Sequence, residues 1–329
     1  MEQLTQNLKD GEMRIMEVPF PALLPGHVLV RNHYSIISPG TEGKTVKDAR
    51  LSYLGKAQAR KEEVKKVITS AKTFGVMKTY NMVMNKLEAY SPLGYSCTGE
   101  IIAMADDVTG FQIGDRVACG GNTAGHSEVV SIATNLCVKV SEKVSLKDAA
   151  FTTMGAIAVQ GVRQSELKLS ESCLVIGLGI IGQLTMQLLE AAGVTAIGTD
   201  IDENQVAAAE KQHPNLVFNR NESNLEQIIL EKTGGFGVDS VIITASTSSH
   251  DPIEFAGQVC RKKGKVIIVG AVPTGFSRKN YFKKELDLRM SSSYGPGRYE
   301  SNYEEKGLDY PIGFVRWTEN RNMQAFVDL

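Results

Sequence analysis

Two patterns of apolar and polar positions divide the chain into an earlier and a later part. Between Met13 and Val140, short alternating runs are separated by Gly and Pro, among them HVLVRNHYS, GEIIAM and SEVVSI. This pattern is typical of β-strands joined by turns. From Cys173 onward, apolar runs alternate with helix-like segments, as in CLVIG and GKVIIVGAV. Strands that alternate with helices predict a parallel sheet with crossover helices, so a β-rich, barrel-like domain is expected to precede an α/β domain.

A helix-like, basic segment interrupts the first pattern between residues 44 and 90. It holds 11 Lys and Arg residues against 4 Asp and Glu residues, and Val64, Val67 and Ile68 recur at helical spacing. Two interpretations stay open at this point. The segment is a solvated helical insertion, or it is a lid whose positive charge attracts an anionic substrate.

Composition narrows the class of protein. The 329 residues are 42% hydrophobic and 22% charged, which is typical of a folded chain with a sizeable core. A formal net charge of −1 gives no overall field that would attract nucleic acid or a membrane, so neither is expected as a partner. The chain has no apolar run long enough for a membrane span and no apolar signal core near its start, which predicts a cytoplasmic protein. Its five cysteines are scattered, so they are expected in the core and not in disulfides or a zinc site.

The strongest chemical signal is the motif Gly177-Leu178-Gly179-Ile180-Ile181-Gly182. It follows an apolar strand and opens a helix-like run, the context that a dinucleotide-binding turn requires. Gly177 would permit the tight turn, Gly179 the approach of a pyrophosphate, and Gly182 the close packing of helix and strand. Ile180 and Ile181 begin the helix whose free N–H groups would hold the pyrophosphate.

Asp200 ends the next predicted strand, 18 residues after Gly182. A carboxylate at this place accepts hydrogen bonds from the adenosine ribose and repels a 2′-phosphate, so NAD is the expected cofactor. Four further residues end later strands of the same predicted sheet, where ligands bind in open α/β folds. These additional cofactor-binding candidates are Thr244, Ala245, Gly270 and Ala271.

With a β-rich domain first and this motif second, the chain resembles the medium-chain dehydrogenase/reductase superfamily. The resemblance is carried by PFPALLPGHVLV, LGYSCTGEIIAM, FQIGDRV, GLGIIG and GKVIIVGAV. It implies a GroES-like catalytic domain at 1–145, which includes the basic insertion 44–90, and a Rossmann NAD-binding domain at 146–329. More narrowly, SPGTEG, PLGYS and KKELDLRMSSSYGPGRYE resemble a bacterial two-module group in which a glucose-fructose-oxidoreductase-like module follows.

Two departures from the superfamily pattern stand out. Its catalytic zinc positions fall here on Ser38 or Pro39, on Tyr95 and near Thr153, and the four-cysteine lobe is missing. Because zinc in catalytic sites takes three protein ligands, we predict no metal. The chain also stops at Leu329, inside a helix-like segment, so the usual return of the chain to the first domain is expected to be missing.

Without a metal, a side chain must take the hydroxyl proton during alcohol oxidation. The resemblance places Tyr95 at the lost His position and Thr41 at the relay hydroxyl, while Glu42 is the nearest carboxylate. These three are the predicted catalytic residues. His33 and His126 are further acid–base candidates. Two cations complete the set as candidate contacts to an anionic substrate, namely Lys44 and Arg298.

The function predicted from the sequence is zinc-independent, NAD-dependent transfer of hydride between nicotinamide and a hydroxyl or carbonyl of a sugar, cyclitol or nucleotide-sugar. A homodimer and a fused or separate C-terminal oxidoreductase module are expected as partners. Two alternatives stay open. One is an NADPH-dependent quinone or enoyl reductase, against which Asp200 counts, and the other is a non-catalytic cofactor-binding module of a larger protein.

Overall fold

The computed structural model describes residues 1–52, 55–56, 58 and 61–329, so part of the predicted insertion lies outside the described residues. The chain divides into two compact units. Unit 1 comprises Met1–Phe151 with Glu305–Gly307, and unit 2 comprises Thr152–Glu304 with Leu308–Leu329. No helix among the described residues is long and apolar enough to cross a membrane.

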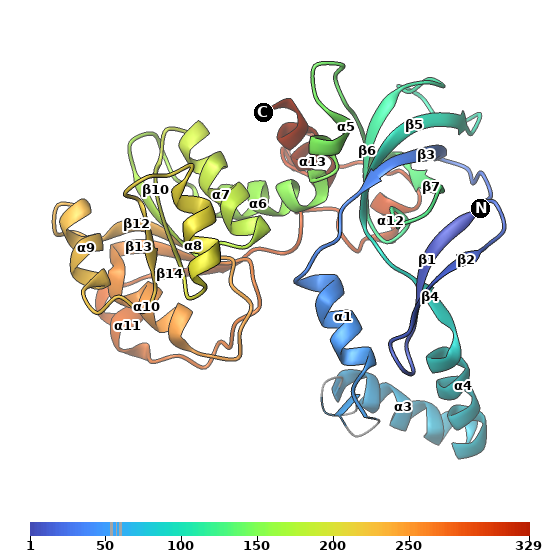
Figure 1. Cartoon of the computed structure of the whole chain (residues 1–329), viewed down its shortest axis with the longest axis horizontal. Helices are drawn as coiled ribbons and strands as arrows, with labels where there is room; N and C mark the ends of the chain where they lie inside the picture. Colours follow the sequence, from blue (N-terminus) through green and yellow to red (C-terminus); the bar gives the residue numbers. More distant parts are fainter. Residues whose placement is uncertain (53–54, 57, 59–60) are drawn as a thin grey trace. The chain divides into compact units, whose positions relative to one another are not determined.

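Unit 1 is built from two antiparallel sheets (Figure 1). One has the strand order β2-β1-β4 and the other β7-β3-β5-β6-β8. The strands are β1 (Glu2–Asn7), β2 (Met13–Glu17), β3 (His27–Ser35), β4 (Tyr90–Pro92), β5 (Ser96–Met104), β6 (Arg116–Gly120), β7 (Val129–Ala133) and β8 (Cys137–Lys139). The helices are α1 (Thr41–Ala49), α3 (Lys61–Phe74), α4 (Val76–Glu88), η1 (Thr134–Leu136) and α5 (Leu146–Ala149). Most of the described residues of the basic insertion lie in α1, α3 and α4.

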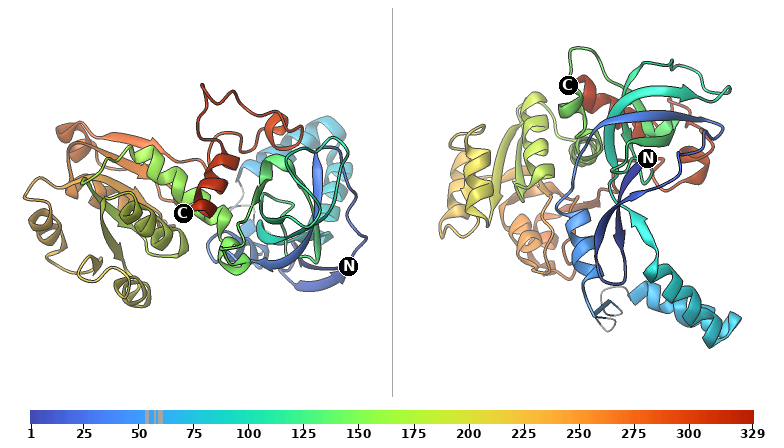
Figure 2. Two further views of the ribbon diagram at one scale, coloured as in Figure 1. Left: turned by 90° about the horizontal axis from the view of Figure 1, so that it is seen from above. Right: turned by 45° about the vertical axis from the view of Figure 1, so that its right-hand side comes forward.

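Unit 2 is a six-stranded parallel sheet of order β11-β10-β9-β12-β13-β14, with helices on both faces (Figures 1 and 2). Its strands are β9 (Ser172–Ile176), β10 (Thr195–Asp200), β11 (Val217–Asn219), β12 (Val238–Ile243), β13 (Cys260–Ile268) and β14 (Asp287–Met290). Its helices are α6 (Thr152–Ser165), α7 (Ile180–Ala191), α8 (Glu203–Glu210), α9 (Leu225–Lys232), α10 (Asp251–Val259), α11 (Arg278–Lys284), α12 (Ser301–Glu304) and α13 (Glu319–Asp328). This strand order is that of a Rossmann fold, so the predicted fold class is confirmed.

The alternation of side chains along each strand gives this sheet two cores. Leu174 and Ile176 of β9 belong to the core that includes α9, α10 and α11, whereas Cys173 and Val175 belong to the core that includes α7. A sheet buried on both faces needs nearly continuous apolar strands, which is what CLVIG and VIITAS are. All five cysteines of the chain are buried thiols.

The boundary between the units lies six residues later than the predicted 145/146. Helix α5 stays with unit 1 because two buried hydroxyls of β5 bond to it. The Thr98 hydroxyl donates to the Leu146 carbonyl, and the Ser96 hydroxyl donates to the Ala150 carbonyl, each at 2.7 Å. At the other end of unit 2, α13 packs on α6, where Gly155 leaves room for the Phe326 ring.

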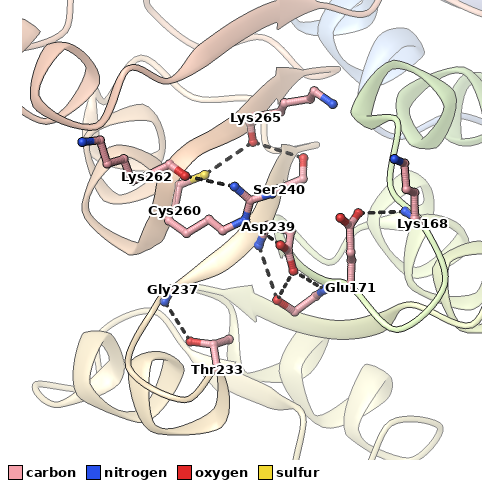
Figure 3. A network of polar contacts seen from close by, with 11 residues as sticks. Lys168, Glu171, Thr233, Gly237, Asp239, Ser240, Cys260, Lys262 and Lys265 are labelled. Atoms are coloured by element: carbon pink, nitrogen blue, oxygen red, sulfur yellow. Dashed lines mark hydrogen bonds and ion pairs between the residues drawn. The ribbon is translucent and has the colours of Figure 1, made fainter.

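A polar network ties three strands together at the amino edge of the Rossmann sheet (Figure 3). The Asp239 carboxylate on β12 accepts bonds from the Ser172 backbone N–H at 2.8 Å and from Arg261 Nε at 2.6 Å. Burial alone would raise the pKa of Asp239, but these bonds and the Ser172 hydroxyl outweigh burial and lower it. The carboxylate form thus stabilises the folded state.

We expect Asp239→Asn to lower the free energy of unfolding at pH 7 by about 1–2 kcal/mol, because a charged acceptor of several bonds is lost. The lowered pKa contributes stability above the unfolded value of about 3.9, and this contribution is lost as the pH falls through the folded value. Urea denaturation at pH 7 and pH 3 should therefore show a smaller pH effect in the variant. Glu171→Gln, in a local loop contact with the Lys168 N–H, is the control. Equal stability of Asp239→Asn and wild type at pH 7 would contradict this assignment.

Candidate functional site

The glycine motif forms the turn between β9 and α7. Gly177 has φ +100°, and a Cβ atom added to it would lie 2.6 Å from the backbone nitrogen of Ala245. A Cβ atom at Gly182 would lie 1.8 Å from the Gly177 carbonyl oxygen, so helix and turn touch backbone to backbone. A Cβ atom at Gly179 would have no heavy atom within 4 Å. A side chain would therefore clash with backbone at Gly177 and at Gly182. At Gly179, beside the start of α7, the space is free.

Helix α7 begins at Ile180 without a side-chain cap on its N-terminus. No side chain caps the N–H groups of this first turn, and the residue before it is Gly179, around whose Cβ position the space is open. Oriented N–H groups at the positive end of a helix are a general binding site for phosphate groups. Pyrophosphate binding is also what the sequence predicts for the start of this helix at Ile180 and Ile181.

Asp200, at the end of β10, holds the turn from one side. One of its carboxylate oxygens accepts a bond from the Leu178 N–H at 2.6 Å, and the other accepts one from the Asp202 N–H at 2.9 Å. The half-buried carboxylate keeps lone pairs for a further donor. It lies beside the glycine turn, which the spacing of 18 residues in the sequence cannot show by itself.

Thr244, after β12, holds the turn from the other side. Its hydroxyl donates to the Gly177 carbonyl at 2.6 Å, and the Ala245 N–H donates to the Ile176 carbonyl at 3.0 Å. Gly270 lies against this segment, because a Cβ atom added to it would be 2.1 Å from the Ala245 carbonyl oxygen. Ala271 continues the contact through a bridge to Ser246. The predicted residues of three strand ends thus meet at one edge of the sheet.

A second polar cluster lies in unit 1, where the loop after β3 enters α1. His126 places one ring nitrogen 2.9 Å from a Glu42 carboxylate oxygen and the other 2.8 Å from the Ser35 hydroxyl. The second Glu42 oxygen accepts the Ser38 N–H at 2.8 Å. Both the Glu42 and the His126 side chain are 9% exposed. A nearly buried carboxylate and imidazole in direct contact form an acid–base pair that can share and pass a proton.

Gly94 packs directly against this pair. A Cβ atom added to it would lie 2.8 Å from the His126 backbone nitrogen and 3.0 Å from the imidazole ring. Gly94 therefore allows the ring to sit against the loop that carries the next residue, the half-buried Tyr95. Thr41 begins α1, with its N–H 3.5 Å from the Ser38 hydroxyl, and the Lys44 side chain is exposed on the same helix.

Two other candidates have different surroundings. His33 is 36% exposed and lies 4.0 Å from Glu100, so it is not part of the buried pair. Arg298 in unit 2 is 8% exposed, forms an ion pair with Glu304 at 2.5 Å and lies over the Tyr299 ring at 4.1 Å. This engagement supports the loop that carries Arg298, and its contact with a substrate stays a prediction.

The residues around Glu42 do not fit a zinc ion. Catalytic zinc takes three protein ligands, and here one carboxylate and one imidazole bond to each other. Throughout the part of the chain that the structure describes, no three His, Cys, Asp or Glu side chains gather in a way that could hold a metal ion.

Of two surface hollows, one is lined by residues of the Glu42–His126 cluster and the other is not. One, of about 290 Å³, is lined by Ser35 and His126 together with His33 and Glu128 of the same unit. Another, of about 770 Å³, lies between α8, β11 and α9 and contains none of the predicted site residues. The smaller hollow therefore reaches His126 and Ser35, whereas Glu42 is not among the residues that line it.

Comparison with known proteins gives consistent relationships. Residues 181–306 match the zinc-binding dehydrogenase family. (R,R)-Butanediol dehydrogenase of Bacillus subtilis (strain 168) is 28% identical over 172 residues, which cover 45% of this chain and 49% of that protein. Galactitol-1-phosphate dehydrogenase from Escherichia coli has a TM-score of 0.70 at 15% identity, covering 100% of this chain and 89% of that one. The chain is thus similar in sequence and in fold to proteins of the medium-chain, zinc-type alcohol dehydrogenase-like superfamily.

Sorbitol dehydrogenase of the same Bacillus strain is 26% identical over 250 residues, covering 66% of this chain and 69% of that protein. The chain spans about half the length of the butanediol dehydrogenase that it matches. Within this medium-chain dehydrogenase fold, the glycine turn lies in unit 2 and the Glu42–His126 pair in unit 1. Sequence reasoning considered both members of that pair but did not connect them, because 84 residues separate them.

Proposed function

We propose that this chain is a zinc-independent, NAD-preferring oxidoreductase that transfers hydride between nicotinamide and a hydroxyl-bearing carbon of a sugar, cyclitol or nucleotide-sugar. The observation that carries the proposal is the glycine turn, open at Gly179 and held between Asp200 and Thr244. Zinc independence is supported by the donor set around Glu42. The expected homodimer and second oxidoreductase module stay predictions.

NAD, when bound, supplies the hydride acceptor. The residues of unit 2 hold it in this proposal. The uncapped N–H groups at the start of α7 bind the pyrophosphate beside Gly179, and the Asp200 carboxylate accepts bonds from the adenosine ribose. Thr244 keeps the turn closed through its bond to the Gly177 carbonyl, while Ala245, Gly270 and Ala271 form the neighbouring strand ends.

Glu42 is the proposed base for the substrate hydroxyl. In this proposal the carboxylate would accept the O–H proton of the substrate, and NAD, when bound, would supply the hydride acceptor. The Ser38 N–H keeps the carboxylate oriented, and His126 contacts its second oxygen. Tyr95 and Thr41, on adjacent segments, are the candidates to orient the substrate oxygen.

His126 lies between Glu42 and the Ser35 hydroxyl. Beside an ionised Glu42 the neutral imidazole donates from Nε2, so its Nδ1 accepts a bond from the Ser35 hydroxyl. In this arrangement His126 orients the carboxylate, and the proton that Glu42 receives returns to solvent when the product leaves. In the reductive direction a protonated Glu42 gives the proton to the substrate oxygen.

The substrate class rests on the relatives. The names of the butanediol, sorbitol and galactitol-1-phosphate dehydrogenases all refer to polyhydroxy or phosphorylated alcohols. Lys44 on α1 is the exposed cation proposed for an anionic substrate. A quinone oxidoreductase of Escherichia coli complexed with NADPH shares the fold at a TM-score of 0.68. Preference for NAD or for NADP therefore distinguishes the proposed dehydrogenase from the reductase alternative.

We expect NADH to bind at least about tenfold more tightly than NADPH, because the Asp200 carboxylate repels a 2′-phosphate. Asp200→Asn removes the charge but keeps an acceptor for the Leu178 N–H, so it should narrow this ratio about tenfold. Fluorescence titration with both cofactors measures it. Asp202→Asn, two residues further along and at the N-terminus of α8, is the matched control. Tighter binding of NADPH by the wild type would instead support the reductase alternative.

A further inference from the structure

Helices α3 and α4 form a basic hairpin in unit 1 (Figures 1 and 2). The turn between them is Gly75, whose φ of +88° lets the chain reverse between two helices. From residue 64 to residue 87 the hairpin has no Asp or Glu. It carries five lysines, namely Lys65, Lys66, Lys72, Lys78 and Lys86. A net charge of −1 for the whole chain hides this local concentration of positive charge.

The same hairpin exposes an unusual number of large apolar side chains. At the turn, Phe74 is 54% exposed, Val76 76% and Met77 74%. Further exposed apolar side chains along the two helices are Val67, Ile68, Tyr80 and Met82. Lysines flank the turn on both sides, and Lys78 Nζ lies 5.6 Å from the centre of the Phe74 ring. Apolar side chains gathered at one place on a surface indicate an interaction site.

Charge decides what covers this surface. The acids of the two helices, Glu62, Glu63 and Glu88, lie at the ends remote from the turn, so two copies packed at the turn would bring Lys72 and Lys78 of each copy together with no acid beside them. An anionic lipid surface neutralises the lysines and at the same time accepts the apolar side chains of the turn. Lys-rich helices with exposed aromatic and aliphatic residues have the chemistry of membrane-surface binding.

We propose that this hairpin, residues 64–87, binds the surface of a membrane containing anionic lipids. Phe74, Val76 and Met77 enter the headgroup region, and the lysines contact the lipid phosphates. The binding is peripheral, since no described helix is long and apolar enough to span a bilayer. The sequence prediction of no membrane partner rested on net charge and on spanning segments, and neither property concerns a surface-binding hairpin. The inference is independent of the proposed catalytic function, because it rests on other residues.

Co-sedimentation of the full chain with vesicles tests the proposal. We expect binding to phosphatidylcholine vesicles containing about 30% phosphatidylglycerol to be at least about tenfold stronger than to pure phosphatidylcholine. It should weaken in about 0.5 M NaCl, where charges are screened beyond a few ångströms. The double variant Val76→Ser/Met77→Ser and the double variant Lys72→Gln/Lys78→Gln should each lose about tenfold in binding.

The control is Phe236→Ser, which removes an apolar side chain that is 78% exposed in unit 2 and should bind vesicles like the wild type. Thermal melting verifies that each variant is folded. Three results would overturn the proposal: no binding to anionic vesicles, equal binding to neutral ones, or an equal loss with Phe236→Ser. Lipid-free self-association of the wild type that Val76→Ser/Met77→Ser abolishes would assign the surface to a second copy and would also overturn it.

Discussion

Gly182→Ala is expected to destabilise unit 2 by about 3 kcal/mol and to abolish dinucleotide binding. The added methyl group would lie 1.8 Å from the Gly177 carbonyl oxygen and 3.0 Å from the Thr244 hydroxyl. The nearest of these atoms belongs to backbone, so no side-chain rotation relieves the clash. Helix α7 must move away from the turn, and the contacts that Thr244 and Asp200 make with it are lost.

Gly179→Ala is the matched comparison, because its Cβ atom would have no heavy atom within 4 Å and Gly179 has φ −65°. We expect this variant to melt within a few degrees of the wild type but to bind NADH at least about tenfold more weakly, since the methyl group would occupy the proposed pyrophosphate position. Thermal melting and NADH titration of both variants measure the contrast. Unchanged stability of Gly182→Ala, or unchanged NADH binding by Gly179→Ala, would refute the respective assignment.

Glu42→Gln is expected to slow hydride transfer by about 100-fold or more, because the neutral amide cannot accept the hydroxyl proton. Single-turnover formation of NADH from a panel of sugar alcohols and cyclitols measures the chemical step. The affinity for NADH, which depends on unit 2, should stay unchanged. His126→Gln should slow the step less and shift its pH profile, since it replaces the imidazole that orients Glu42 but leaves the carboxylate.

Two controls separate this mechanism from others. His33→Ala alters a residue of the same surface hollow outside the buried pair and should leave the rate unchanged. A zinc chelator should likewise leave the wild-type rate unchanged. Full activity of Glu42→Gln would show that Glu42 is not the base. Loss of activity on chelation would overturn the proposal of zinc independence.

Much of unit 2 is predictable from sequence because its signals are local. The strand before the glycine motif, the motif and the helix after it lie within 20 consecutive residues, 172–191, and each requires a particular backbone geometry. Unit 1 is harder to predict from the sequence. Its strands pair across long separations, such as β3 with β7, and its boundary depends on two hydroxyl bonds to α5 that leave no pattern in the sequence.

The Rossmann unit, the positions of its glycines and the acid that follows them can be read from the residues alone, because periodicity and steric demand act on neighbouring residues. The contact between Glu42 and His126, the ion pair of Arg298 with Glu304 and the exposed apolar side chains at the turn of the basic insertion become visible only in the folded chain. Such contacts and exposures depend on where distant segments come to lie in space. No spacing rule along the chain encodes them.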